Sequence, residues 1–456
     1  MKRRFVTFFL LNLVFAWICE AEYQVNTHAT NEQRNADMAM GSAGDFVIVW
    51  SSYLQDGSSN GIFGRRFDPN CVAIDDEFQI NTTSSGNQTE PAVAMDAAAG
   101  FVVTWHGPGV SELDSEDIFA RRFDPNGSPI GEEFLVNTHT GDRQRYPDAI
   151  VNPDGSFAVV WESVNVPAEG DRAICGQLYD SNGVTAGPEF VINAEASVCR
   201  YPSVAADADG GFVAVWLDDR STNSIMARLF DPHGLPRTET FPVNTVRFRS
   251  VTRPSVAMDS AGYFVVTWDG DPDLASLDDI HARAFDPNGA PLGEQFPVNT
   301  TIDGPQRYPQ VALNDVAEFV IVWESVMDPS INERDIFAQR FNNFGEPLGS
   351  EFLVNTYAEG DQRYPVAALG GDGSFVTAWQ SYAQDGSRYG IFAETGRLVG
   401  SADFNDDGFV DLHDYRIFAE QWLEEGPALP ADLIFDDRID QHDLAEFCRQ
   451  WPALAH

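Results

Sequence analysis

The chain has 456 residues, a formal net charge of −42 and a pI near 4.2. This surplus of carboxylates excludes nucleic acid as a partner, because a polyanion would be repelled over most of the surface. The length exceeds what one compact core needs, so we expect several domains or an array of repeats.

The N-terminal residues predict an export signal. A basic start at Lys2 to Arg4 precedes an apolar run from Phe5 to Trp17 that is too short to span a bilayer. We expect residues 1–21 to be a signal peptide that is cleaved after Ala21, so the protein is secreted or associated with the cell surface. No later stretch has the length and apolar character of a membrane span.

Residues 22–399 repeat one structural unit. Seven tryptophans recur at intervals of just over 50 residues, each four residues after a phenylalanine: Trp50, Trp105, Trp161, Trp216, Trp268, Trp323 and Trp379. The β-branched run before each tryptophan is typical of a buried strand, and each unit holds three further strand-like segments. Four short antiparallel strands per unit predict an all-β propeller with seven blades. The resemblance is to propellers in general and to Val-Asn-Thr repeats of exported bacterial proteins, and it implies no activity.

The two ends of the repeat predict how the ring closes. The last unit ends at Ile391 to Glu394 without a fourth strand, whereas Tyr23 to Thr27 matches the fourth-strand segment Phe134 to Thr138. We therefore predict that this N-terminal strand completes the last blade and leaves no free edge.

One face of the propeller is the expected binding surface. The connection after each tryptophan strand varies in length between blades and shares a face with the segments that read Gln-Arg-Tyr-Pro. Two interpretations of these arginines stay open: they brace neighbouring blades against carboxylates, or they hold acidic sugars or other anions together with the tyrosines. The candidate ligand face comprises Arg145, Tyr146, Arg307 and Tyr308.

No residue is assigned to catalysis. The tryptophans are expected to pack in the core, and the lone His106 and His281 to be solvated. A glycosidase needs two carboxylates roughly 5 to 10 Å apart, but 70 acidic residues make a chance pair common. Carboxylates on the expected binding face are Glu162, Glu324, Asp218 and Asp269.

The cysteines leave the disulfide pattern open. Cys175 takes a position filled by phenylalanine in other blades, so we expect it in the core, with a bridge to Cys199 in the next unit as one alternative. The pairing among Cys71, Cys175, Cys199 and Cys448 is not fixed by the sequence.

Residues 402–451 predict a calcium module. Oxygen side chains occupy loop positions 1, 3, 5, 9 and 12, position 7 offers a carbonyl, and glycine stands at position 6, which is the donor set that Ca²⁺ prefers. The predicted strong site comprises Asp403, Asn405, Asp407, Phe409, Asp411 and Asp414. Apolar residues after the loop predict a helix.

A second copy begins 29 residues later and departs from the pattern. Ile434 replaces an oxygen ligand and Asp437 replaces the glycine, so we expect weak calcium binding there. The predicted weak site comprises Asp432, Asp436, Asp440 and Asp443. Another helix is expected after this loop.

Two such loops, each followed by one helix, resemble a dockerin. The resemblance implies calcium-dependent docking onto a cohesin-bearing scaffold or cell-surface protein, with Leu412, His413, Gln441 and His442 setting the specificity. The leading hypothesis is therefore a secreted, monomeric and non-enzymatic protein whose propeller is a recognition or scaffold module, with polysaccharide as one candidate ligand. The alternative is a glycoside hydrolase or other polysaccharide-degrading enzyme carried on a dockerin.

Overall fold

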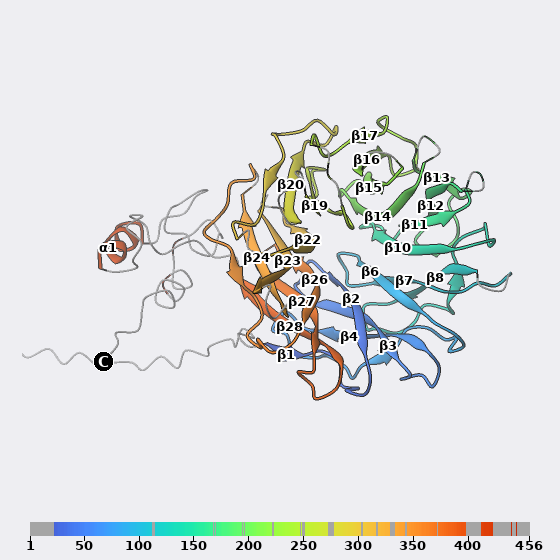
Figure 1. Ribbon diagram of the computed structural model, residues 1–456, viewed down its shortest axis with the longest axis horizontal. Coiled ribbons are helices and arrows are strands. Elements are labelled where there is room, and N and C mark those ends of the chain that lie inside the picture. Colours follow the sequence, from blue (N-terminus) through green and yellow to red (C-terminus); the bar gives the residue numbers. More distant parts are fainter. Residues whose placement is uncertain are drawn as a thin grey trace, which may run out of the picture.

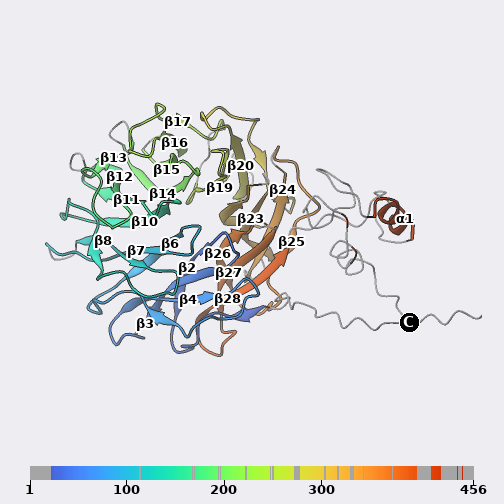
Figure 2. The same ribbon diagram turned by 180° about the vertical axis from the view of Figure 1, so that it is seen from behind.

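The computed structural model describes residues 22–397 with short gaps in loops, and residues 412–422, 439 and 444. The gaps are 112–114, 167, 169, 194, 196, 221–222, 247, 249–250, 272–277, 302–303, 316–317, 329–332, 343 and 372. Within these bounds the chain forms seven four-stranded antiparallel sheets around a central axis, drawn in Figure 1 and from behind in Figure 2. The predicted all-β seven-bladed propeller is confirmed.

The strands follow one another blade by blade. Blades 1 to 4 consist of β2 (Gln33–Met40), β3 (Phe46–Tyr53), β4 (Asn60–Phe67), β5 (Phe78–Gln79); β6 (Thr89–Met95), β7 (Phe101–Pro108), β8 (Glu116–Phe123), β9 (Phe134–Leu135); β10 (Gln144–Val151), β11 (Phe157–Val164), β12 (Arg172–Tyr179), β13 (Phe190–Val191); and β14 (Cys199–Ala206), β15 (Phe212–Asp218), β16 (Ser224–Phe230), β17 (Phe241–Pro242).

Blades 5 to 7 consist of β18 (Ser255–Met258), β19 (Phe264–Gly270), β20 (Asp279–Phe285), β21 (Phe296–Pro297); β22 (Gln306–Leu313), β23 (Phe319–Asp328), β24 (Glu333–Phe341), β25 (Phe352–Leu353); and β26 (Gln362–Leu369), β27 (Ser374–Tyr382), β28 (Tyr389–Arg397), β1 (Tyr23–Gln24). The first strands of neighbouring blades contact one another all the way round, so β2, β6, β10, β14, β18, β22 and β26 line the axis.

The seven tryptophans hold neighbouring blades together. Each is at most 1 % exposed and lies in an apolar cluster drawn from two adjacent blades. Trp161 of blade 3, for example, shares its cluster with Val102 and Ile118 of blade 2. The prediction that these indoles pack in the core is confirmed, since none of them presents a stacking surface to solvent.

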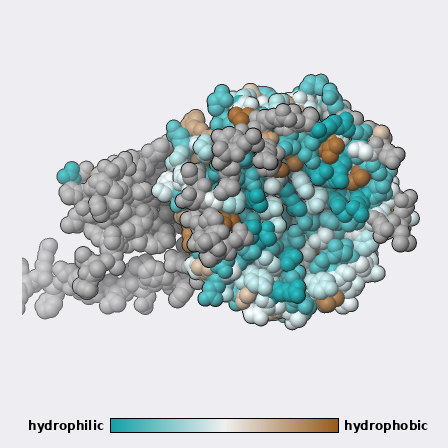
Figure 3. Space-filling view, viewed as in Figure 1, coloured by the Kyte–Doolittle hydropathy of each residue, from teal (hydrophilic) through white to brown (hydrophobic). Residues whose placement is uncertain are grey.

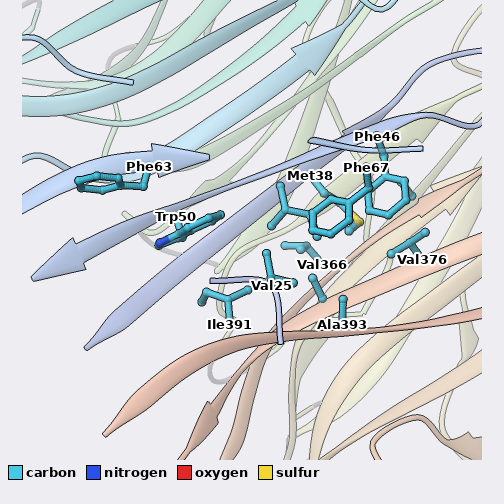
Figure 4. Packing of buried hydrophobic residues seen from close by; sticks show 13 residues of the cluster. Val25, Met38, Phe46, Trp50, Phe63, Phe67, Val366, Val376, Ile391 and Ala393 are labelled. Atoms are coloured by element: carbon cyan, nitrogen blue, oxygen red, sulfur yellow. The ribbon is translucent and has the colours of Figure 1, made fainter. Parts of the chain in front are cut away.

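The N-terminal strand closes the ring as predicted. Tyr23 pairs with Ala393 and Gln24 with Phe392, which makes β1 the outer strand of blade 7. Val25 continues the pairing through a hydrogen bond from its N–H to the Ile391 carbonyl of 2.8 Å. Figure 4 shows Val25 and Ile391 facing residues of blade 1, including Trp50, in one buried cluster. The seventh interface between blades is therefore as apolar as the other six.

The Val-Asn-Thr repeat has a structural cause. The Asn137 side chain accepts a hydrogen bond from the Ile118 N–H at 2.7 Å, and its amide donates to the His139 carbonyl at 3.0 Å. The bond from isoleucine N–H to asparagine recurs in every blade, at Asn26, Asn81, Asn137, Asn193, Asn244, Asn299 and Asn355. Each buried amide thus continues the hydrogen bonding of a two-residue outer strand.

The threonine of the same repeat binds the next blade. Thr138 donates its N–H to the Glu189 carboxylate at 2.6 Å, and Thr300 binds Glu351 in the same way at 2.7 Å. At the closure, Thr356 donates to Glu22 at 2.8 Å. Glu22 is the first residue after the predicted cleavage point, so cleavage there would keep this contact.

The remaining described residues add one helix, α1 (Leu412–Glu420), at the place where the sequence predicts a helix after the first calcium loop. The Phe418 side chain is buried, and its ring lies 5.6 Å from the Trp422 ring. No helix within the described residues has the length and apolar character needed to cross a bilayer. The face of the propeller drawn in Figure 3 is mostly hydrophilic with scattered apolar residues.

Candidate functional site

A bulge at the start of the first strand turns one residue toward the axis in six of the seven blades. Pairing between β10 and β11 shifts register between Arg145 and Asp148, and five other blades shift at the equivalent place. The residue at this position has φ between 50° and 54° in six blades. A left-handed backbone is costly for tyrosine and glutamate, and such strain is often kept at functional sites.

Seven equivalent residues, one from each blade, line a single cavity of about 180 Å³ on the axis. We name them the channel ring: Asn35, Glu90, Tyr146, Tyr201, Arg253, Tyr308 and Tyr364. Four members are tyrosines, whereas blades 1, 2 and 5 carry an amide, a carboxylate and a guanidinium. The ring therefore breaks the sevenfold repeat with three polar groups.

These three polar residues bind one another across the axis. Arg253 Nη1 lies 2.7 Å from Glu90 Oε2, and the Asn35 amide donates to Glu90 Oε1 at 2.9 Å. The Arg253 guanidinium also lies over two aromatic rings, 4.7 Å from the centroid of Tyr146 and 5.1 Å from that of Tyr201. Burial opposes ionisation of Glu90, but the charge and hydrogen bonds of Arg253 outweigh it and lower the pKa of Glu90.

The tyrosines of the ring form two pairs. The rings of Tyr146 and Tyr201 lie 4.8 Å apart, and those of Tyr308 and Tyr364 lie 4.6 Å apart. Burial raises the pKa of Tyr308 to about 12, so its hydroxyl is neutral and can donate a hydrogen bond at physiological pH. Paired aromatic rings with hydroxyl edges offer both flat apolar contact and hydrogen bonding.

The lining of the same cavity includes two carboxyl groups, Asp37 of β2 and Asp148 of β10. Each binds the first strand of the next blade, since Asp37 accepts the Val93 N–H at 2.7 Å and Asp148 the Val204 N–H at 2.9 Å. Burial raises the pKa of Asp37 to about 7, helped by the charge of Asp148, and burial raises the pKa of Asp148 to about 6. Two carboxyl groups with pKa values near neutrality therefore line the cavity on the axis.

The arginines of Gln-Arg-Tyr-Pro lie inside the first strands, beside the channel ring. Arg145 forms an ion pair with Glu116 of the preceding blade, and Arg307 pairs with Asp278 of the preceding blade at 2.7 Å. These contacts are those expected of arginines that brace adjacent blades. Tyr146 and Tyr308, the other two residues of the predicted ligand face, belong to the channel ring itself.

The four carboxylates considered for catalysis lie near the ends of the second strands, on the same face, but three are inaccessible. Glu162 is fully buried and paired with Arg172, Glu324 is buried between Arg334 and Arg363, and Asp269 is 1 % exposed and bound by Thr252. The fourth, Asp218, accepts hydrogen bonds from Ser197 and from the Arg220 N–H. Burial raises the pKa of Asp269 to about 7. These positions suit structural roles more than contact with a polymer.

One expectation about a polar residue is wrong, and one alternative that the sequence left open is excluded. His106 is 5 % exposed instead of solvated, its ring meets the edge of Tyr146, and burial lowers its pKa to about 4. Cys175 is in the core as expected, but Cys175 and Cys199 are free thiols in separate apolar clusters, so the alternative of a bridge between them is excluded. Burial raises the pKa of both thiols to about 12, so neither is a reactive thiolate.

The predicted calcium ligands of both loops lie outside the described residues, except that Asp414 falls within the backbone of α1, as do Leu412 and His413. Gln441 and His442 also lie outside the description. In the part of the chain that is described, no group of three His, Cys, Asp or Glu side chains is arranged to hold a metal ion.

Comparison with known proteins identifies the class of fold. No protein-family model and no curated protein matches the chain. Among solved structures, a protein of unknown function from Dyadobacter fermentans is similar over 82 % of this chain and 97 % of its own, with 9 % identity and a TM-score of 0.50. The polysaccharide lyase Uly1 is similar over 83 % of this chain and 100 % of its own, with 10 % identity and a TM-score of 0.50.

The Hadza microbial sialidase Hz136 covers 83 % of this chain and 68 % of its own, at 13 % identity and a TM-score of 0.49. The two matches with a TM-score of 0.50 support a shared fold, and at such identities they carry no residue of a site across. The chain is thus a seven-bladed propeller, and its function has to be argued from the channel ring.

Proposed function

We propose that the propeller is a carbohydrate-active module that binds a polysaccharide at the channel ring. The observation that carries this proposal is the asymmetric ring itself, where four tyrosines surround a bonded trio of amide, carboxylate and guanidinium. Sugars offer flat apolar faces and many hydroxyls, so they suit aromatic rings beside groups that both donate and accept hydrogen bonds. Two further cavities, of about 190 and 410 Å³, adjoin the ring, because Arg253 and Tyr364 line both of them as well.

The comparisons add a precedent. A polysaccharide lyase is built on the same fold, which makes polysaccharides the first ligand class to test and favours a carbohydrate-active propeller over a pure scaffold. Degradation of the bound polymer is the second candidate function. It would require reacting groups other than the three buried carboxylates, because those do not reach the surface.

Removing an aromatic ring from the site should weaken polysaccharide binding. We expect Tyr308→Ala to reduce affinity about five- to tenfold in glycan-array and calorimetric binding assays, since an aromatic contact contributes roughly 1 kcal/mol. Tyr263→Ala is the matched control, because Tyr263 is 44 % exposed in the turn between β18 and β19, at the opposite end of the strands. Equal loss in both variants, or no loss in either, contradicts the proposed site.

The same glycans should be assayed for new reducing ends and for unsaturated products. Cleavage by the full-length protein would establish the degrading function, whereas binding without cleavage would leave a recognition module.

For the tail we propose calcium-dependent docking onto a cohesin-bearing partner. The proposal rests on the donor set of the first loop, and it is supported by α1 (Leu412–Glu420), which overlaps the segment predicted to be helical. Asp403, Asn405, Asp407, Asp411 and Asp414, with the Phe409 carbonyl, would hold the ion, and calcium would supply the cross-link that lets so short a segment fold.

Calcium titration of the full-length protein should reveal one tight and one weak or undetectable site in the tail. Asp403→Ala and Asp407→Ala should each abolish the tight site and the folding of the tail, because each removes a charged ligand. Calorimetry measures the stoichiometry, and the Asp432→Ala variant provides the comparison in the degenerate loop. Two equally tight sites would refute the prediction.

A further inference from the structure

A cationic pocket adjoins the channel ring between blades 1 and 7. It encloses about 190 Å³, and its lining comprises Arg34, Asn35, Glu90, Arg253, Arg363, Tyr364, Gln380 and Tyr389. Three guanidiniums and two phenols thus converge on a space that contains one carboxylate. The volume is below the roughly 300 Å³ of the smallest drug-sized pockets, so it suits one sugar ring or its charged substituent.

The ion pairs around this pocket leave the arginines in excess. Glu32 is shared by Arg34 and Arg388, each at 3.0 Å, so that neither arginine has a carboxylate of its own. Glu324 is likewise shared, with Arg334 at 3.1 Å and Arg363 at 3.4 Å.

Counting the Arg253 pair with Glu90 and the Arg334 contact to Asp361, five guanidiniums share four carboxylates in these ion pairs. The chain as a whole has a net charge of −42, so this local balance is unusual for the molecule.

The cations are also held in position. The Arg34 guanidinium lies 4.7 Å from the centroid of the Tyr389 ring, and that of Arg363 lies 4.8 Å from the Tyr364 ring. Arg34 and Arg253 remain 43 % and 37 % exposed at their side chains, so a ligand can reach them. Planar guanidiniums fixed by aromatic rings match the fork geometry of carboxylate and sulfate oxygens. Charges more than about 8 Å away are largely screened at physiological salt. The acidic remainder of the surface therefore does not cancel the attraction of these arginines for an anion.

We propose that this pocket binds the anionic substituent, a carboxylate or a sulfate ester, of a sugar residue whose polymer lies on the channel ring. The inference rests on the proposed polysaccharide binding and specifies its ligand class as an acidic polysaccharide. It also differs from the bracing role of Arg145 and Arg307, because those arginines do not line the pocket. Arg253 joins the two sites, since it belongs to both the ring and the pocket.

The test compares matched charged and neutral probes on the full-length protein. One pair is an oligogalacturonate and its methyl ester, the other a sulfated galactan oligosaccharide and its desulfated form, with sodium sulfate alone as the free anion. We expect the charged member of at least one pair to bind at least tenfold more tightly by calorimetry. Sodium sulfate alone should bind far more weakly, because it lacks the sugar contacts at the ring.

Arg34→Gln and Arg363→Gln should each remove most of this preference, measured as the ratio of the affinity for the charged probe to the affinity for its neutral partner. Arg363→Lys should retain part of it, because lysine keeps the charge without the fork. Arg237→Gln is the matched control, since Arg237 lies in the connection between β16 and β17 at the opposite end of the strands. Circular dichroism checks that each variant is folded. The Arg34 substitution should perturb folding less than the Arg363 substitution, because the Arg34 side chain is more exposed.

The possible outcomes separate the two proposals. Equal binding of charged and neutral probes overturns the acidic-sugar inference but leaves polysaccharide binding intact. An undiminished preference in both arginine variants also overturns it, since the anion would then lie elsewhere. Absence of binding to every glycan, including a broad array, removes the proposed function and the inference with it. Tight binding of sodium sulfate alone would replace the sugar ligand with a free anion.

Discussion

Trp161→Ala should destabilise the propeller by about 3–5 kcal/mol, which is the usual cost of deleting a fully buried aromatic side chain. Trp161 is 0 % exposed and fills the interface between blades 2 and 3, so its loss leaves a cavity that two sheets would have to collapse around. Chemical unfolding of the full-length protein, followed by circular dichroism, measures the change. We expect Trp161→Phe to cost substantially less, because much of the volume is retained.

This substitution separates packing from recognition. If Trp161→Ala unfolds at the wild-type denaturant concentration but loses affinity for glycans, the indole is a ligand platform and the packing interpretation is wrong. Tyr308→Ala provides the opposite pattern, since its side chain lines the channel cavity and should affect binding more than stability.

Asp37→Asn should stabilise the protein at alkaline pH and have little effect near pH 4. Burial and the charge of Asp148 raise the pKa of Asp37 in the folded state to about 7, so the folded protein holds a proton that the unfolded chain releases near its ordinary pKa. The contribution of Asp37 to the free energy of unfolding of the wild type is therefore greatest below about pH 4. It declines as the pH rises toward 7 and stays constant above that pH. Asparagine cannot ionise, so its advantage should reach on the order of 2–4 kcal/mol at pH 8.

Denaturant unfolding at pH 4, 6 and 8 measures this dependence. Asp148→Asn should show a smaller gain of the same sign, because burial raises the pKa of Asp148 to about 6. Asp154→Asn should show no gain, since hydrogen bonds from Ser156 lower the pKa of its exposed carboxylate. Parallel stability profiles for wild type and Asp37→Asn would mean that Asp37 is charged at no cost in the folded protein.

The architecture was predictable because the same residues recur in each repeat unit and specify the same strands. The recurring phenylalanine and tryptophan specify one buried strand per blade, and a four-stranded unit can bury that strand only between two neighbours. Closure was predictable as well, because Tyr23 to Thr27 duplicates the outer-strand segment that the last unit lacks. The blade strands and the closure of the ring follow from local sequence patterns and from the number of strand segments in each unit.

The channel ring was predictable only in part. Arg145, Tyr146, Arg307 and Tyr308 stand out through a repeated motif, and two of the four belong to the ring. Glu90 and Arg253 were missed because they depart from that motif, although each stands directly before a proline at the aligned position. Aligning the blades on this proline would have found them. Their pairing across the axis depends on the number of blades and on the bulge, which no single unit specifies.

Burial is the reason for the errors at polar residues. His106 and the three carboxylates each follow a tryptophan by one residue, a position that the sequence places near a strand end and therefore near solvent. In the folded ring the neighbouring blades cover these strand ends. The separation of Cys175 from Cys199 has the same origin, since adjacent units contribute to different interfaces.

The closure by β1 also fixes the order of events during synthesis. Asn26 and Ile391, which hydrogen-bond across the seam, lie 365 positions apart, so the first strand made must wait for almost the last. Six blades can form while the chain is still growing, but the latch can engage only when residue 393 has emerged. A chain that ends before Ile391 cannot form this pairing, so the outer strand of the last blade stays unpaired and its edge is open to other strands.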